Sequence, residues 1–238
     1  ENVVAATGPF QKPSFPQIVP ESASLQQIHS SAYKNPQQLP AGGVLVVGAG
    51  ASGTQIAEEL RKAGREVYLS VGEHYRPPRS YRDRDYCWWL GALGLWDEVK
   101  IKPKKEHVAF AVSGYEGGKT VGFRRLAHMG ITLVGSTPNW NNGVLRFADG
   151  LVQNIAEGDK AYFDVLRDAD AYIDRNGLDL PPEPQAWDLL PDPECLTQPL
   201  SQLDIAEAGI TTIIWATGFK FDFSWLKVDA FDEKGLPF

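Results

Sequence analysis

The sequence predicts an α/β protein, and this prediction rests on neighbouring features of one stretch, residues 44–71. A β-branched apolar run at 44–47 leads into a Gly-x-Gly-x-x-Gly turn at 48–53. Apolar residues at helical spacing follow over 56–63, and a second apolar strand is expected at 66–71. Strand, glycine turn, helix and strand in this order form the Rossmann-like unit that binds a dinucleotide.

Each glycine of the turn has an expected role. Gly48 permits the tight turn, Gly50 lets the backbone approach a pyrophosphate, and Gly53 lets the helix pack close to the strand. The free N–H groups at the start of the helix then face the phosphates. The sequence therefore predicts a nucleotide site built from Gly48, Ala49, Gly50, Ala51, Ser52, Gly53 and Gln55.

Composition narrows the classes of function. The chain has 238 residues and a net charge of -7 spread without long acidic blocks, so nothing favours nucleic acid. Cys87 and Cys195 lie far apart in the sequence, which gives neither a disulfide framework nor zinc spacing. The four histidines show no metal-ligand spacing either. No apolar run approaches the roughly 18 residues of a membrane span, and a reducing cytoplasm fits best.

The rest of the chain alternates apolar elements with proline-rich connectors. A short buried strand is expected at 3–6, and an aromatic helical patch at 86–96. The longest helix is expected over 151–173, with Gly177 as its cap. A proline-rich linker spans 180–199.

One tripeptide occurs twice, each time at the end of an apolar strand. Ala6-Thr7-Gly8 and Ala216-Thr217-Gly218 bracket the dinucleotide unit. A short strand that is buried without pairing would leave N–H and C=O groups unsatisfied. We therefore predict that residues 3–8 and 212–218 run near one another, outside the sheet built on Val44 to Val47.

In these features the sequence resembles class B flavoprotein monooxygenases, the flavin-containing monooxygenase family and its bacterial relatives. The resemblance is carried, in order, by residues 5–10, 29–34, 48–53 and 215–219. It implies an NADPH-binding domain inserted between crossing strands of an FAD-binding domain. The domains implied are a crossing strand and linker at 1–40, the NAD(P)H domain at 41–200, and a return strand at 201–238.

The sequence also departs from the family pattern. Of the fingerprint Phe-x-Gly-x-x-x-His-x-x-x-(Tyr/Phe)-(Lys/Arg), the second half is kept as His29, Tyr33 and Lys34, whereas Ala23 and Leu25 replace Phe and Gly. Tyr33-Lys34 is more similar to the heteroatom-oxygenating branch than to the Baeyer–Villiger branch. The earlier glycine turn that holds FAD in the family is absent, so we expect a segment of a longer protein or a partner chain that supplies it.

The end of the second strand predicts the nucleotide. An NAD site has an acidic residue at this position to bind the ribose hydroxyls, whereas this sequence has Ser70-Val71-Gly72. Arginines at 76, 79 and 82 suit a 2′-phosphate, because guanidinium binds phosphate oxygens in a fork. NADPH is therefore preferred, although Glu73 could reverse this, and the arginines could instead form a surface loop paired with Asp83 and Asp85. The cofactor contacts expected beyond the turn are Ser70 and Arg79 at the 2′-phosphate, and Thr7, Gly8, Ala216, Thr217 and Gly218, the last two near the nicotinamide–flavin junction.

The function that the resemblance implies is an NADPH-dependent flavin monooxygenase. NADPH would reduce FAD, oxygen would be captured as a flavin hydroperoxide, and one oxygen atom would pass to a nucleophilic nitrogen or sulfur of a small molecule. No side chain is assigned as acid or base, because the cofactor carries the chemistry. Two alternatives stay open: a pyridine nucleotide-disulfide reductase, which needs a close cysteine pair, and a nucleotide-binding module that is inactive on its own. A homo-oligomer is possible.

Overall fold

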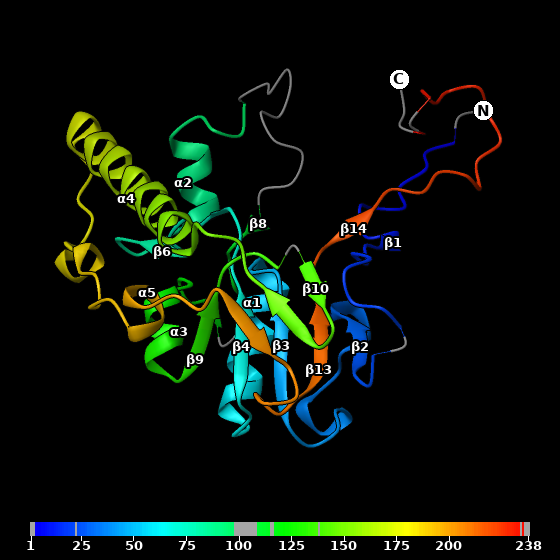
Figure 1. The fold of residues 1–238 in the computed structure, drawn as a ribbon. Coiled ribbons are helices and arrows are strands. Elements are labelled where there is room, and N and C mark those ends of the chain that lie inside the picture. The colour runs from blue at the N-terminus through cyan, green and yellow to red at the C-terminus, as the bar shows by residue number, and fades with distance from the viewer. Residues whose placement is uncertain are drawn as a thin grey trace.

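The structure is a computed structural model that describes residues 3–21, 23–97, 109–114, 117–137, 139–233 and 235. Its centre is a five-stranded parallel sheet (Figure 1) with the strand order β2-β13-β3-β4-β9. These strands are β2 (Gln26–His29), β3 (Gly43–Val47), β4 (Val67–Ser70), β9 (Ile131–Val134) and β13 (Ile210–Trp215).

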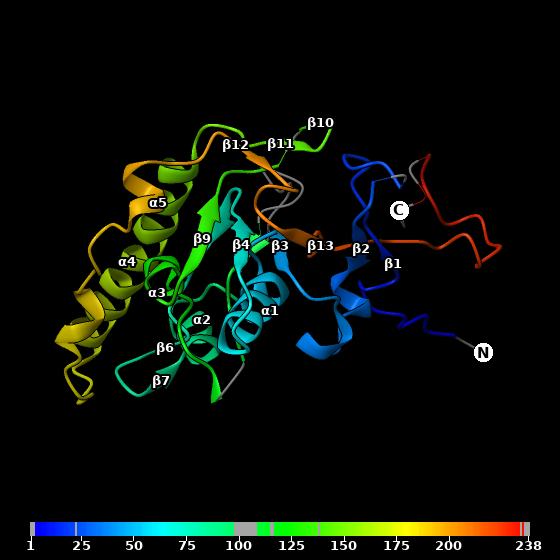
Figure 2. The same ribbon diagram turned by 60° about the horizontal axis from the view of Figure 1, so that its bottom comes forward.

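Both faces of the sheet are covered, which is why β3 is an unbroken apolar run rather than an alternating one. On one face Val44 and Val46 pack with α1 (Ala51–Lys62), α3 (Phe123–His128) and α5 (Glu194–Thr197). On the other face lies an antiparallel sheet of β10 (Asn139–Asn141), β11 (Val144–Arg146) and β12 (Gln202–Asp204). Figure 2 shows α1 and these three strands on opposite sides of the parallel sheet.

A second group of helices packs beside the sheet. Helix α2 (Tyr86–Ala92) lies against the long helix α4 (Leu151–Asn176), as Figure 1 shows. A cluster of aromatic and aliphatic side chains joins the two helices. The predicted long helix is thus confirmed, and Gly177 ends it with a φ of 60°. Here φ is positive, so glycine suits the position.

Short elements complete the fold. The strand pairs are β5 (His74–Tyr75) with β8 (Ala109–Phe110) and β6 (Ser80–Tyr81) with β7 (Arg84–Asp85). The 3₁₀ turns are η1 (Ser30–Ala32), η2 (Pro36–Gln38) and η4 (Pro184–Trp187). No helix within the described ranges is long and apolar enough to cross a membrane.

The structure contradicts the placement predicted for the two Ala-Thr-Gly segments. β13 is an interior strand of the sheet that contains Val44, between β2 and β3. Ile213, Ile214 and Trp215 are fully buried there, because a strand that is apolar on both sides needs a cover on both faces. Val3 and Val4 form no strand and are 94% and 86% exposed.

A different pair of segments lies side by side instead of residues 3–8 and 212–218. β1 (Lys12–Pro13) pairs antiparallel with β14 (Phe219–Lys220), so the chain enters and leaves the sheet region through adjacent segments. We call the pair of β1 and β14 the arm, and Figures 1 and 2 both show it projecting from the parallel sheet. The α/β class with a parallel Rossmann-like sheet is confirmed. The domain boundaries stay a prediction, although β2 and β13 show that the sheet extends beyond residues 41–200.

Candidate functional site

The turn between β3 and α1 shows why two of its three glycines are required by the protein itself. Gly48 has a φ of 105°, and a Cβ on it would lie 2.4 Å from the carbonyl oxygen of Ala216. A Cβ on Gly53 would lie 1.8 Å from the carbonyl oxygen of Gly48. Both positions therefore bring backbone against backbone, and side chains are excluded there.

Gly50 is different, because the internal packing does not require a glycine there. Its φ is -76° and its ψ is -169°, an extended conformation open to any residue. A Cβ would make ordinary contacts at 3.8 Å. The fold therefore does not require a glycine here, and a backbone without a side chain permits the close approach of a phosphate. The chemistry of this turn, backbone N–H groups with no side chain over them, suits the phosphates of a nicotinamide dinucleotide.

The start of α1 adds hydrogen-bond donors to this turn. Gly50 caps the helix without a side-chain hydrogen bond, and no acidic residue lies in the first turn. The first intrahelical bond runs from the Thr54 N–H to the Gly50 carbonyl at 3.1 Å, which leaves the earlier N–H groups directed out of the helix. Ala51 and Ser52 are exposed at this end. Backbone donors and the helix dipole together favour an anion here.

The second Ala-Thr-Gly segment borders the turn. The Ala216 N–H donates to the Val47 carbonyl at 2.8 Å, directly before Gly48. The turn therefore sits where the strand order passes from β3 to β13, and ligands of open α/β sheets bind at such a switch point. Thr7 and Gly8 are exposed on the N-terminal arm, where both accept hydrogen bonds from the Gln11 amide.

His29 joins this region to the arm. Its Nδ1 accepts from the Ser31 N–H at 3.2 Å, so Nε2 carries the proton and donates to the Gly218 carbonyl at 2.9 Å. The Ser14 N–H donates to the same carbonyl, and the Thr217 hydroxyl donates to the Ser14 carbonyl. The bond to Gly218 joins residues 189 positions apart in the sequence, so the partners of His29 are not only local. Burial lowers the pKa of His29 below its ordinary 6.5, and the bond to Gly218 opposes this.

The other fingerprint residues have local partners. The Tyr33 hydroxyl donates to a Glu59 carboxylate oxygen of α1 at 2.9 Å. Burial, followed by this bond and the nearby negative charge, raises the pKa of Tyr33 above its usual range. The Lys34 N–H donates to the Gln38 side chain. These bonds attach the loop after β2 to α1.

The residues predicted to read a 2′-phosphate have partners within the protein. The Ser70 hydroxyl is buried, donates to the Gly135 carbonyl and accepts from Thr137, each at 2.9 Å. Ser70 therefore gives no support to the role predicted for it. Arg76 is also buried and pairs with Asp159 at 2.7 Å.

The two arginines that follow are more accessible. Arg79 pairs with Asp85, and Arg82 pairs with Asp170 at 2.8 Å. The alternative of a surface loop paired with acids is thus partly realised. Arg79 and Asp85 expose 27% and 46% of their side chains, and such pairs contribute little to stability. Arg79 can therefore exchange its partner for a ligand phosphate.

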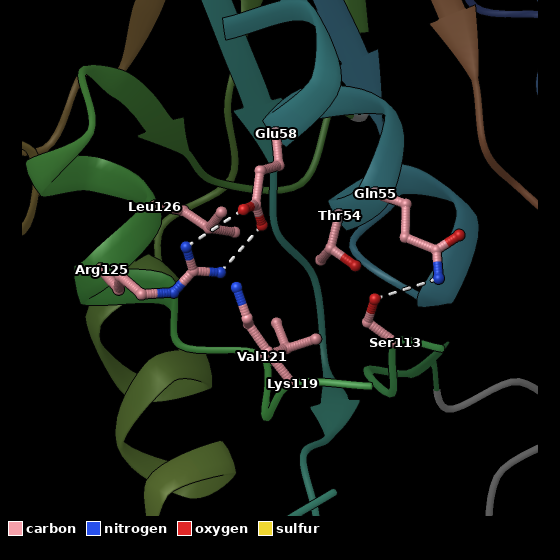
Figure 3. A pocket seen from close by; sticks show the side chains of 8 residues that line it. All are labelled: Thr54, Gln55, Glu58, Ser113, Lys119, Val121, Arg125 and Leu126. Carbon is pink, nitrogen blue, oxygen red and sulfur yellow. Dashed lines mark hydrogen bonds and ion pairs between the residues drawn. The ribbon is translucent and has the colours of Figure 1, made fainter. Parts of the chain in front are cut away.

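Figure 3 shows a small pocket beside α1, lined by Thr54, Gln55, Glu58, Ser113, Lys119, Val121, Arg125 and Leu126. Its volume is about 10 Å³, room for about one water molecule and far too little for a nucleotide. Arg125 pairs with Glu58 at 2.8 Å, and the Gln55 amide donates to the Ser113 hydroxyl at 3.1 Å. We read it as the joint between α1, α3 and the segment before α3.

The comparisons with known proteins agree with this geometry. A family model described as pyridine nucleotide-disulphide oxidoreductase matches residues 1–91. A CzcO-like uncharacterized oxidoreductase of Geobacillus kaustophilus is 32% identical over all of this chain and 52% of its own length. The flavin-containing monooxygenase iboF of Amanita muscaria is 40% identical over 29% of this chain and 14% of its own. The chain is similar to flavin-dependent oxidoreductases, and these likenesses support a flavoprotein monooxygenase-like family.

The chain is shorter than the relatives that it matches. It spans about half the length of the curated relative that it matches from end to end. A solved flavin-containing monooxygenase of Stenotrophomonas maltophilia aligns with 98% of this chain and 47% of its own, with 15% identity and a TM-score of 0.47.

The contrast between two glycines gives the first prediction. Gly53→Ala should lower the free energy of unfolding by about 1–3 kcal/mol, because its methyl group meets backbone that cannot give way. Gly50→Ala should stay close to wild type. Urea unfolding of both variants measures this, and equal losses would contradict the reading of Gly50.

His29 gives a pH prediction. Its folded pKa is lowered, so the folded state binds fewer protons, and the stability that His29 contributes is full above about pH 6.5 and lost as pH falls through the folded pKa. His29→Gln should cost about 1 kcal/mol at pH 7.5 through the bond to Gly218. It should then lose less than wild type between pH 7.5 and 5.5.

The matched control is His128→Gln, which alters an exposed histidine bonded to the Pro191 carbonyl. It should change the free energy of unfolding at pH 7.5 by less than about 0.5 kcal/mol. A His29→Gln variant with the wild-type pH dependence in urea unfolding would show that His29 does not titrate as described.

Proposed function

We propose that this chain is the nicotinamide-nucleotide-binding part of an NADPH-dependent flavin monooxygenase. One observation carries the proposal: Gly50 lacks a side chain that the fold itself would accept. The likeness to flavin-dependent oxidoreductases supports the reaction class.

The strand order supports a position for each end of the nucleotide. The pyrophosphate would be held by the N–H groups of residues 50–53, where the helix begins. The adenosine end would lie beyond β4, and the nicotinamide end beyond β13, at Ala216 to Gly218. This follows from the strand order on the two sides of β3. In this position the nicotinamide would lie next to the link to the arm.

Arg79 is the residue we propose for the 2′-phosphate. It follows β4 by nine residues, is partly exposed, and pairs with an exposed acid rather than a buried one. Arg76 lacks this freedom because its charge already balances Asp159 in the interior. NADPH rather than NADH is therefore the proposed reductant.

FAD is the second cofactor of the proposal, held by a portion of the same protein or a partner chain that the arm of β1 and β14 would join. When bound, the flavin supplies hydride acceptance and oxygen activation. The residues described here would orient the nicotinamide and shape its surroundings. The proposed substrate is a small molecule with a nucleophilic nitrogen or sulfur, and the proposed location is the cytoplasm.

A disulfide reductase is the second candidate, and it is favoured by the name of the matching family model alone. Cys87 is exposed on α2 and Cys195 is half-buried in α5, and both are free thiols. A reductase of that type needs a close cysteine pair near the nicotinamide. Neither cysteine lies at the glycine turn or in the Ala216–Gly218 segment, so oxygenation is preferred.

Binding of the nucleotide tests the proposal directly. Calorimetric titration of the chain with NADP+ should show one site, and Gly50→Ala should weaken it by about tenfold or more, because a methyl group occupies the space of a phosphate oxygen. The unfolding free energy of the same variant serves as the control. Unchanged affinity would refute the assignment of this turn.

Arg79→Ala should weaken NADPH by about 10- to 100-fold and NADH by less than twofold, since a charge-assisted hydrogen bond is worth about 1.5–3 kcal/mol. Arg84→Ala, an exposed arginine of the same loop, is the matched control. If both nucleotides weaken equally, another residue reads the 2′-phosphate.

A further inference from the structure

The phosphate turn faces a short strand rather than open solvent. A Cβ on Gly50 would lie 3.8 Å both from the Cβ of Ala109 and from the carbonyl oxygen of Phe110, the two residues of β8. The side of Gly50 that has to admit a phosphate is therefore already in van der Waals contact with protein.

A phosphate does not fit between these two walls. A Cβ built on Gly50 would be the first atom beyond the backbone, and at 3.8 Å it would already touch Ala109 and Phe110. The gap between Gly50 and β8 therefore has the width of one carbon atom, whereas a phosphate group carries oxygen atoms on every side of its phosphorus. Binding at Gly50 therefore requires β8 to move.

Among the described residues, β8 is held by its pairing with β5 and by aromatic neighbours. It pairs with β5 over two residues, and the Tyr75 carbonyl accepts a hydrogen bond from the Ala111 N–H at 2.9 Å. Phe110 is 48% exposed, its ring lies near those of Tyr75 and Tyr86, and Ala111 is fully buried. Beyond the strand, the Ser113 hydroxyl accepts from the Gln55 amide of α1 at 3.1 Å, as Figure 3 shows. A two-residue ladder is weak by itself.

β5 is anchored much more firmly than β8. His74 is buried against α4, where a Cβ on Gly158 would lie 2.2 Å from the imidazole Nε2. The next residue after the strand, Arg76, forms the buried ion pair with Asp159 of the same helix. When the two strands separate, β8 moves and β5 stays.

We propose that residues 109–113 form a strap that closes the phosphate turn, and that the hydrogen bond between Gln55 and Ser113 is its latch. This inference rests on the proposed function, because it concerns access of the dinucleotide to the same turn. The nucleotide binds only molecules with an open strap, so its apparent affinity is reduced by the fraction that is open.

A removable crosslink between β5 and β8 tests the strap. Tyr75 and Phe110 are partners across the parallel pair, and strands spaced about 4.8 Å apart place their Cα atoms within disulfide range. The variant Tyr75→Cys with Phe110→Cys is made with Cys87→Ser, so that no exposed native thiol competes. Thiol titration and the melting temperature confirm the bond and the fold.

The oxidised form should bind NADP+ at least about tenfold more weakly than the reduced form of the same polypeptide, because the crosslink removes the open state. Reduction should restore binding. Equal affinity in both redox states would overturn the strap. Absence of NADP+ binding by the wild-type chain would instead overturn the proposed function.

Ser113→Ala tests the latch separately. Loss of one hydrogen bond favours the open state, so NADP+ should associate about 2- to 10-fold faster in stopped-flow measurements, with an unchanged dissociation rate. Ser201→Ala, at an exposed serine next to β12, is the matched control. A Ser113→Ala variant with wild-type association would overturn the latch and leave the crosslink to decide on the strap.

Discussion

The contact between three backbone segments at the end of β3 is the constraint on which the rest of this structure depends. Gly48, Gly53 and Ala216 approach so closely that no Cβ fits on either glycine. This contact fixes the angle at which α1 leaves the sheet and brings β13 beside β3. Since α1 begins there, the same contact aims the helix N–H groups at the switch point of the sheet. The same turn thus contains the glycines that packing requires, Gly48 and Gly53, and the glycine that packing does not require, Gly50. Gly50 is the one for which we propose a role in phosphate binding.

His29 extends this constraint to the arm. The carbonyl of Gly218 accepts from both His29 and Ser14, so the end of β2 and the two crossing segments meet at one acceptor. Gly218 has a φ of 76°, the left-handed conformation that turns the chain out of the sheet after β13. The aromatic rings of Phe15 and Phe219 pack on the imidazole and shield this joint.

Sequence reasoning reached the dinucleotide unit because its signals are local. Periodicity and glycine spacing predicted β3, α1 and β4, and the helical pattern predicted α4 with its glycine cap. The position of β13 was missed because parallel pairing joins residues about 170 apart in sequence, and an apolar run does not reveal its neighbours. Its apolar character on both sides, over Ile213 and Ile214, was the signal for an interior strand.

In the candidate site, too, the roles set by local sequence could be predicted and those set by distant contacts could not. Backbone roles at Gly48 and Gly53 follow from spacing alone. Asp85, a nearby acid, could be named from the sequence as a partner of Arg79. The roles of Ser70 and Arg76 depend on distant partners, Gly135 and Asp159, which no sequence pattern near them indicates. The segment at 109–113 could not be foreseen at all, because its contact with Gly50 joins parts of the chain that lie some sixty residues apart.

The interior position of β13 changes how the arm and the nucleotide turn are related. If the return strand lay outside the sheet, the arm could move without disturbing the turn. Instead, three residues lead from Trp215 at the end of β13 to Phe219 of β14, and the first of them, Ala216, touches Gly48. A displacement of β14 would therefore act on the backbone beside Gly48, in the turn proposed to hold the phosphates. In the proposed function, a portion of the protein joined to the arm would act on nucleotide binding through this one strand.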